Sequence, residues 1–152
     1  MEKTEFVTKD NVHEATNLEK IRSLMANAER LGEDEVVKRC KKRIFEIAGN
    51  EGETEIEIRL FQALAAYEEI LREKHNKAVR ANYTKRKIKN KGVIQTLTDW
   101  ALNKKVTPGF EALVSQGLED FTGEKIVIDF AEEFPVEVVE AAKIKFQSIN
   151  KT

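Results

Sequence analysis

The chain has 152 residues, of which 41% are hydrophobic and 35% are charged. This composition is too apolar for an intrinsically disordered chain and too polar for a membrane protein, and the length suits one domain with a sizeable core. Basic and acidic residues nearly cancel, at 26 against 27, and the single cysteine excludes a disulfide within the chain. One free thiol, a charged first segment and the lack of an 18-residue apolar stretch predict a cytoplasmic protein with no membrane partner.

The first apolar repeat follows a polar segment. Residues 1–15 are expected to form a flexible or docked N-terminal arm, and residues 16–150 are expected to form a single helical domain. Asn17 is a favourable N-cap residue, and the apolar side chains after it recur every three or four residues, which predicts a helix with one buried face. Gly32 is the natural end of this helix, because glycine readily adopts the left-handed conformation that closes a helix.

Two further helices are predicted before residue 76. Asp34 is expected to cap the second helix and Gly49 to end it, and the short connection predicts an antiparallel hairpin with the first helix. Thr54 is expected to cap the longest helix, over about residues 55–75. The alanines in this helix would permit close packing against its neighbours.

The second half of the chain is less regular. Residues 93–102 show helical apolar spacing, and a short helix is expected over about 110–117. Residues 125–130 have β-branched character, but no other segment offers a partner strand, so an irregular helix is favoured. Pro135 is expected at the first position of the last helix. The whole pattern predicts one compact all-α domain of about six or seven helices, with a minor two-stranded element as the main alternative.

The near-zero net charge hides two segments of opposite charge. Residues 72–91 contain nine basic residues against the single acid Glu73, which gives a local charge of +8. Residues 111–140 contain nine acidic residues against the single base Lys125, which gives a local charge of −8. The sequence is therefore strongly dipolar.

The basic segment is expected to contain a short helix. Thr84 would cap it, and Gly92 would end it or kink the chain. Its lysines recur four residues apart, and cations in the first turn oppose the helix dipole, so the helix needs a compensating interaction. Packing of Ile88, the acidic segment or an outside polyanion would supply it.

Three interpretations of the basic segment remain open: contact with nucleic acid, pairing with the acidic segment, and a solvated helix face. We favour nucleic acid, DNA rather than RNA, because Lys and Arg neutralise phosphates while Asn, Thr and Tyr add neutral hydrogen bonds and a ring for stacking. A second basic cluster at residues 38–43 would extend this surface if the two helices pack together. The candidate contacts are Arg80, Tyr83, Lys85, Arg86, Lys87, Lys89, Lys91, Lys38 and Lys42.

Two other functions are alternatives. In the first, the oppositely charged segments pair between subunits of a homodimer or capture a protein partner. In the second, Glu69 and Glu73, one helical turn apart, hold a divalent metal ion in a nuclease. The Asp/Glu-x-Lys pattern of many nucleases does not occur in the chain, however, so the sequence favours a protein without catalytic residues.

No cofactor or metal site is predicted. Cys40, His13 and His75 lack the close ligand pairs that zinc sites use, and the chain has no glycine-rich phosphate-binding loop. Cys40 lies in a basic run, so neighbouring cations could lower its pKa. A small buried helix residue is the simpler interpretation of this cysteine.

Three stretches resemble a group of small, uncharacterised bacterial proteins. They are Tyr67–Leu71, Arg80–Gly92 and Gly109–Val114, and the resemblance covers roughly residues 34–145. The group has Ser-Arg-Thr where this chain has Asn82-Tyr83-Thr84, so an amide and a phenol replace a hydroxyl and a cation. The resemblance implies a shared helical fold and a recurring basic arm, and it implies no activity.

Overall fold

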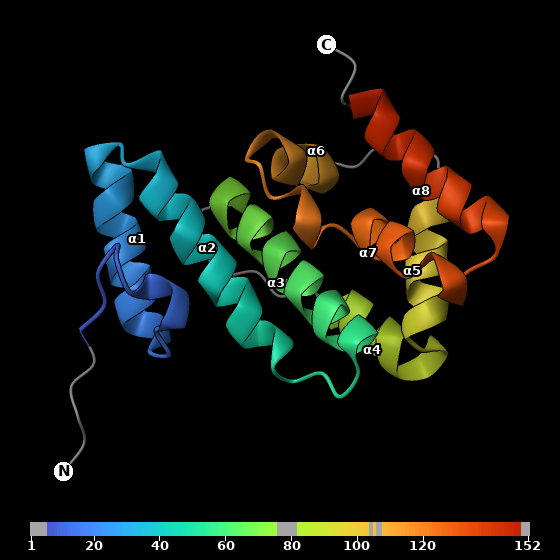
Figure 1. The fold of residues 1–152 in the computed structure, drawn as a ribbon, viewed down its shortest axis with the longest axis horizontal. Helices are drawn as coiled ribbons and strands as arrows, with labels where there is room; N and C mark the ends of the chain where they lie inside the picture. Colours follow the sequence, from blue (N-terminus) through green and yellow to red (C-terminus); the bar gives the residue numbers. More distant parts are fainter. Residues whose placement is uncertain (1–5, 76–81, 104, 106–107, 150–152) are drawn as a thin grey trace.

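The structure is a computed structural model that describes residues 6–75, 82–103, 105 and 108–149 (Figure 1). This part of the chain is all-helical and contains eight α-helices, slightly more than the six or seven expected. The α-helices are α1 (Leu18–Leu31), α2 (Asp34–Gly49), α3 (Glu55–His75), α4 (Asn82–Lys91), α5 (Val93–Leu102), α6 (Pro108–Ser115), α7 (Gly123–Asp129) and α8 (Val136–Ile149). Short 3-10 helices are η1 (Val12–Glu14), η2 (Glu119–Phe121) and η3 (Ala131–Glu133).

Several helix ends follow directly from local sequence. The side chain of Asn17 accepts a hydrogen bond from the Lys20 amide at 3.2 Å, and Gly32 closes α1 with a φ of 72°. Thr54 accepts from the Glu57 amide at 3.2 Å, as its expected role at the start of α3 requires. Asp34 is instead the first residue of α2, with Glu33 at the N-cap position.

The strand alternative for residues 125–130 is wrong, because residues 123–129 form α7. The Thr122 side chain accepts from the Lys125 amide at 3.2 Å and so caps this helix. Ile126 and Val127 are both buried although they are adjacent in the sequence. Because this short helix is buried on much of its surface, its apolar residues follow one another without helical spacing. The sequence of such a segment resembles that of a buried strand.

The core consists of two clusters that share α3. The first holds α1, α2 and η1 together and includes Ala66 and Ile70 of α3. The second joins α5, α7 and α8 and includes Leu60 and Ala63 of α3. In Figure 1, α3 accordingly runs through the middle, with α1 and α2 on one side and α5, α7 and α8 on the other. None of the helices in the described ranges is long and apolar enough to span a bilayer.

The N-terminal arm is docked over its described part. Val12 of η1 is fully buried in the first cluster, and Ala15 is nearly so. Arg43 of α2 donates from Nε to the Ala15 carbonyl at 2.7 Å. Residues 12–15 are thereby tied to α2.

Candidate nucleic-acid interface

The basic helix α4 contains five basic and no acidic residues among its ten. It begins at Asn82, so Thr84 lies inside the helix rather than at the expected N-cap position. Ile88 packs against the second core cluster, and Gly92, with φ 90° and ψ 167°, separates α4 from α5. Packing of Ile88 is therefore one of the interactions that offset the like-charge repulsion in this helix.

Two of the five bases in α4 are already paired within the chain. Lys85 Nζ lies 3.0 Å from Oε1 of Glu68 on α3, and Lys87 Nζ lies 2.7 Å from Oδ2 of Asp99 on α5. These carboxylates lie outside residues 111–140. Internal pairing of the basic helix therefore occurs, but with α3 and α5 instead of the acidic segment.

The contact with Lys87 lowers the pKa of Asp99 on α5. The hydrogen bond from Lys87 lowers the pKa of Asp99, and a hydrogen bond from the Gln95 side chain, at 2.8 Å, acts in the same direction. Because the lowered pKa keeps Asp99 ionised over a wide pH range, Lys87 retains its ion pair with α5.

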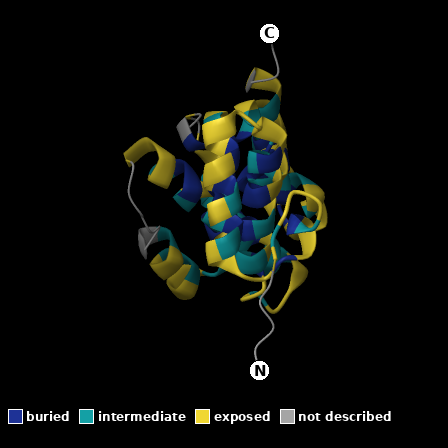
Figure 2. Cartoon of the chain, turned by 90° about the vertical axis from the view of Figure 1, so that its left-hand side faces the viewer, coloured by how far each residue is buried: buried dark blue, intermediate teal, exposed yellow. Residues whose placement is uncertain are grey.

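The remaining three bases of α4, Arg86, Lys89 and Lys91, are exposed. None of the three forms an ion pair with a residue that the structure describes. Figure 2 shows the chain coloured by burial, and exposed residues dominate the described part of α4. The positive charge of these three side chains is thus left for solvent or for another molecule.

The second basic cluster, on α2, is largely used inside the fold. Lys41 is buried, forms an ion pair with Glu73 of α3 and donates to the Gln116 side chain at 2.8 Å. Arg43 is bonded to the backbone of residue 15. Lys38 is half-buried and only Lys42, of the two predicted contacts on this helix, is exposed.

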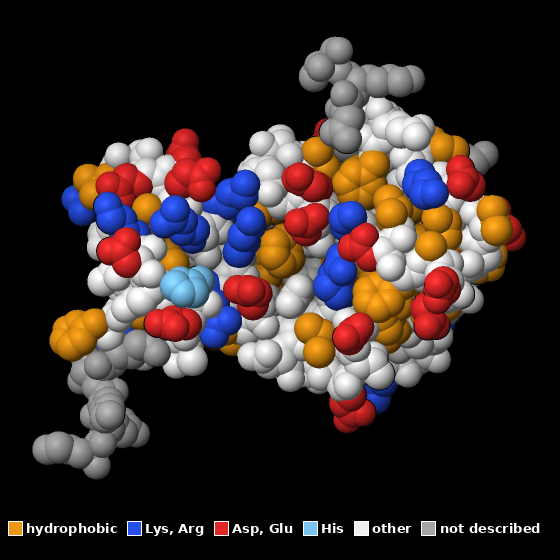
Figure 3. Space-filling model, in the orientation of Figure 1, with side chains coloured by type: hydrophobic (Ala, Val, Ile, Leu, Met, Phe, Trp, Pro, Cys, Tyr) orange, Lys and Arg blue, Asp and Glu red, His pale blue; other side chains and the backbone are white. Residues whose placement is uncertain are grey.

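The two basic clusters are attached to different sides of α3. Lys41 pairs with Glu73 and Lys85 pairs with Glu68, and five residues in a helix correspond to a rotation of about 140°. Figure 3 shows Lys and Arg side chains over α1 and α2, but Asp and Glu side chains lie between them. The cluster on α2 therefore does not extend the exposed face of α4.

The remaining predicted residues are Arg80, Tyr83, Glu69 and Glu73. Arg80 and the side chain of Tyr83 lie outside the described residues. Glu69 pairs with Arg22 at 3.3 Å and Glu73 pairs with Lys41, so the two carboxylates contact different basic side chains. Among the residues that the structure describes, no three His, Cys, Asp or Glu side chains are grouped to hold a metal ion.

The interpretation of Cys40 as a small buried helix residue is confirmed, and the alternative that flanking cations lower its pKa is wrong. Cys40 is fully buried, and desolvation by this burial, with a smaller contribution from Glu29, raises the pKa of its thiol to about 11. The basic neighbours in the sequence project away from the thiol, since helix neighbours differ by about 100° in direction. Cys40 is a small residue of the first core cluster.

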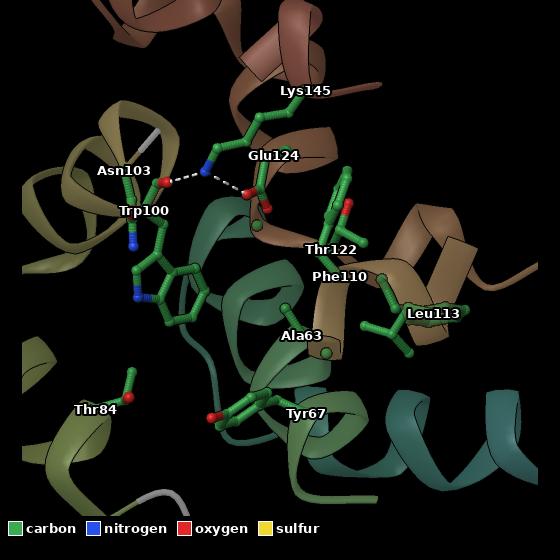
Figure 4. A pocket seen from close by; sticks show the side chains of 13 residues that line it. Ala63, Tyr67, Thr84, Trp100, Asn103, Phe110, Leu113, Thr122, Glu124 and Lys145 are labelled. Atoms are coloured by element: carbon green, nitrogen blue, oxygen red, sulfur yellow. Dashed lines mark hydrogen bonds and ion pairs between the residues drawn. The ribbon is translucent and has the colours of Figure 1, made fainter. Parts of the chain in front are cut away.

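A cavity of about 220 Å³ lies beside α4, and it could not be predicted from the sequence (Figure 4). It opens between the two core clusters and draws its residues from α3 to α8. Its lining residues are Ala63, Tyr67, Thr84, Trp100, Asn103, Gly109, Phe110, Leu113, Phe121, Thr122, Gly123, Glu124 and Lys145. These residues span more than eighty positions of the chain, so periodicity along the sequence cannot reveal that they meet.

An almost buried ion pair closes one wall of this cavity. Lys145 Nζ lies 3.0 Å from Oε2 of Glu124 and donates to the Trp100 carbonyl at 2.5 Å. A Cβ atom on Gly123 would lie 2.9 Å from Cζ3 of Trp100, so glycine leaves the space that the indole ring occupies. Glu124 and Lys145 thus fix α7 and α8 to the backbone of α5.

Comparison of the chain with protein-family models, with curated proteins and with solved structures found no match.

Proposed function

We propose that the chain binds nucleic acid through the exposed bases of α4. The single observation that carries this proposal is the charge of α4: it has five bases and no acid, and only two of the bases pair with a carboxylate of a described residue. A like-charged helix on the surface gains little for folding, because exposed charges are well solvated and repel one another. The same arrangement supplies affinity for a phosphate backbone through release of counterions.

The ion pairs of α4 reduce its candidate phosphate contacts from five bases to three. Arg86, Lys89 and Lys91 are available to phosphates, whereas Lys85 and Lys87 hold α4 against α3 and α5. We therefore assign a positioning role to Lys85 and Lys87 and a binding role to the other three. Lys42 is exposed on a different part of the fold and is not needed by this proposal.

The test compares two variants of equal charge. One variant replaces Arg86, Lys89 and Lys91 by Gln, and the control replaces the exposed bases Lys9, Arg30 and Lys143 by Gln. Binding to labelled single-stranded and duplex DNA, and to RNA of the same sequence, is measured by fluorescence anisotropy between about 50 and 200 mM salt.

We expect the control to bind like the unmodified chain. The α4 variant should bind more weakly, and the slope of log affinity against log salt should fall in magnitude by about 2 to 3. Equal losses in both variants would show only a dependence on net charge and would contradict a specific role for α4. Undetectable binding by the unmodified chain at low salt would reject the proposal.

A protein-interaction function is the second candidate, and one observation favours it. Several exposed carboxylates of the acidic segment form no ion pair with a described residue, and they are Glu111, Glu119, Asp120, Glu132, Glu133 and Glu137. They could meet α4 of a second copy. Light scattering at low salt would then give a dimer mass that falls to the monomer mass at high salt, and a monomer at both salt concentrations would exclude this function.

A further inference from the structure

We propose that the cavity beside α4 receives a single unpaired base of the nucleic acid that α4 binds. This inference rests on the proposed function, and it names the part of the ligand that the fold recognises besides phosphate. Four features support it: the size and walls of the cavity, its neutral lining, its polar rim and its position next to the basic helix.

The size and walls suit one ring system. Drug-sized ligands occupy cavities of about 300 to 1,000 Å³, and this cavity is smaller, at about 220 Å³. Tyr67 and Trp100 line it from α3 and α5, and Phe110 and Phe121 add further aromatic surface. Aromatic side chains of this kind are the surfaces on which unstacked bases pack.

The charge of the lining excludes a phosphate group and accepts a neutral ring. Among the described residues of the lining, Lys145 is the only cation, and both Glu124 and the Trp100 carbonyl hold its ammonium group. The pair has no net charge and stands almost out of solvent, at 8% and 10% exposure of its side chains. Phosphates are therefore expected outside the cavity, and the uncharged base inside.

The rim carries uncharged groups that match the edge of a base. Figure 4 shows the Tyr67 hydroxyl pointing toward Thr84, with the side-chain nitrogen atoms of Trp100 and Asn103 on the same side of the cavity. An indole N–H donates, an amide and two hydroxyls both donate and accept, and base edges present donors and acceptors. Such groups would orient a base without requiring a particular charge.

The position of the cavity connects it to α4. Thr84 of α4 lines the cavity, and the exposed Lys91 lies two turns further along on the same side of this helix, about 20° from Thr84 around its axis. A strand with a phosphate on Lys91 would thus pass the mouth of the cavity, whereas Arg86 and Lys89 lie on the other side of α4 and would bind phosphates further from it. A paired base cannot leave its stack without a cost, so single-stranded or locally unpaired nucleic acid is the expected ligand class.

The experiment uses Trp100 as its reporter, because it is the only tryptophan of the chain. Three ligands of equal length are compared: single-stranded DNA, the same strand with abasic residues in place of its bases, and a duplex. Anisotropy of a label reports binding through phosphates, and Trp100 emission reports occupation of the cavity. We expect all three to bind, and only the single strand with bases to change the emission.

Two variants test the walls of the cavity. Tyr67, 39% exposed, changed to Ala should weaken binding of single-stranded DNA about tenfold, while binding of the abasic strand stays unchanged. Tyr67→Phe should retain most of the affinity because the ring remains. Phe6→Ala, at an aromatic residue that is 78% exposed and lies outside the cavity, is the matched control.

The outcomes separate this inference from the function on which it rests. Equal affinity for the strands with and without bases, together with unchanged Trp100 emission, would overturn the cavity as a base site and leave the role of α4 intact. Failure of all three ligands to bind would overturn both. A change in emission with the base-containing strand that Tyr67→Ala abolishes would establish the cavity as the recognition element.

Discussion

Lys145 and Glu124 form an ion pair that is almost completely shielded from water, with 3.0 Å between Nζ and Oε2. The same ammonium group donates to the Trp100 carbonyl, so one side chain of α8 links α7 and α5. Removing one partner of such a pair is costly, because the other charge is left buried and unpaired.

Lys145→Met is therefore expected to lower the free energy of unfolding by about 3 kcal/mol or more. The double variant Lys145→Met with Glu124→Leu should lose less, because no buried charge remains. Urea denaturation followed by circular dichroism measures the two single variants, Lys145→Met and Glu124→Leu, and the double variant. A loss in the double variant that equals the sum of the two single losses would show that the pair is not coupled.

The pH dependence of the contact between α4 and α5 is set by Asp99. Because Lys87 and then Gln95 lower its pKa in the folded chain, its stabilising effect is present above the unfolded pKa of about 3.9 and is lost as the pH falls through the folded value. The pair is partly exposed, so we expect its contribution to be less than about 1 kcal/mol.

Lys87→Met should raise the pKa of Asp99 toward its ordinary value, measured by NMR titration of the carboxyl carbon. Lys89→Met is the control, since Lys89 is exposed on the same helix and forms no ion pair with any described side chain. Similar shifts in both variants would indicate that the general charge of α4, rather than the direct contact, acts on Asp99.

The buried thiol of Cys40 predicts alkaline sensitivity. Its pKa is raised from the ordinary value of 9.0 to about 11 in the folded chain. The stabilising effect of the protonated thiol is therefore fully present below pH 9 and is lost as the pH rises through 11. A water-soluble disulfide reagent at pH 8 should react with native Cys40 far more slowly than with the chain in urea. Equal rates in the native and unfolded chains would contradict the buried position.

Gly92 sets the junction between α4 and α5 with a backbone conformation, φ 90° and ψ 167°, that is almost confined to glycine. Gly92→Ala should cost about 1 to 3 kcal/mol through backbone strain, since an added Cβ would meet no atom within 4 Å. Gly32, at φ 72° and ψ 22°, is the matched position, and Ala there should cost about 1 to 2 kcal/mol. Urea denaturation measures both, and a smaller cost at Gly92 than at Gly32 would contradict the strain argument.

The helical class and several helix ends could be predicted from sequence because they depend on neighbouring residues. Asn17, Gly32 and Thr54 act through hydrogen bonds or backbone angles within one helical turn. A few neighbouring residues of the sequence are therefore enough to predict their roles. Residues 123–129 were ambiguous because burial on much of a short helix removes the periodic signal that separates helix from strand.

The partners of the charged residues could not be predicted in the same way. The basic run at residues 38–43 looks solvated in sequence, yet Lys41 is buried against Glu73, which lies more than thirty residues away. Likewise Lys85 and Lys87 meet Glu68 and Asp99 instead of the acidic segment, because the packing of α4 decides which carboxylates come within reach. The cavity beside α4 depends on six helices together and leaves no local signature.

The sharing of α3 between both core clusters has a consequence for how the molecule opens. Neither half can separate without stripping apolar surface from this one helix, and α3 keeps its contacts with one core cluster until both halves have opened. Amide protons in the middle of α3 should accordingly exchange with deuterium only through global unfolding, and they should be the slowest to exchange in the chain.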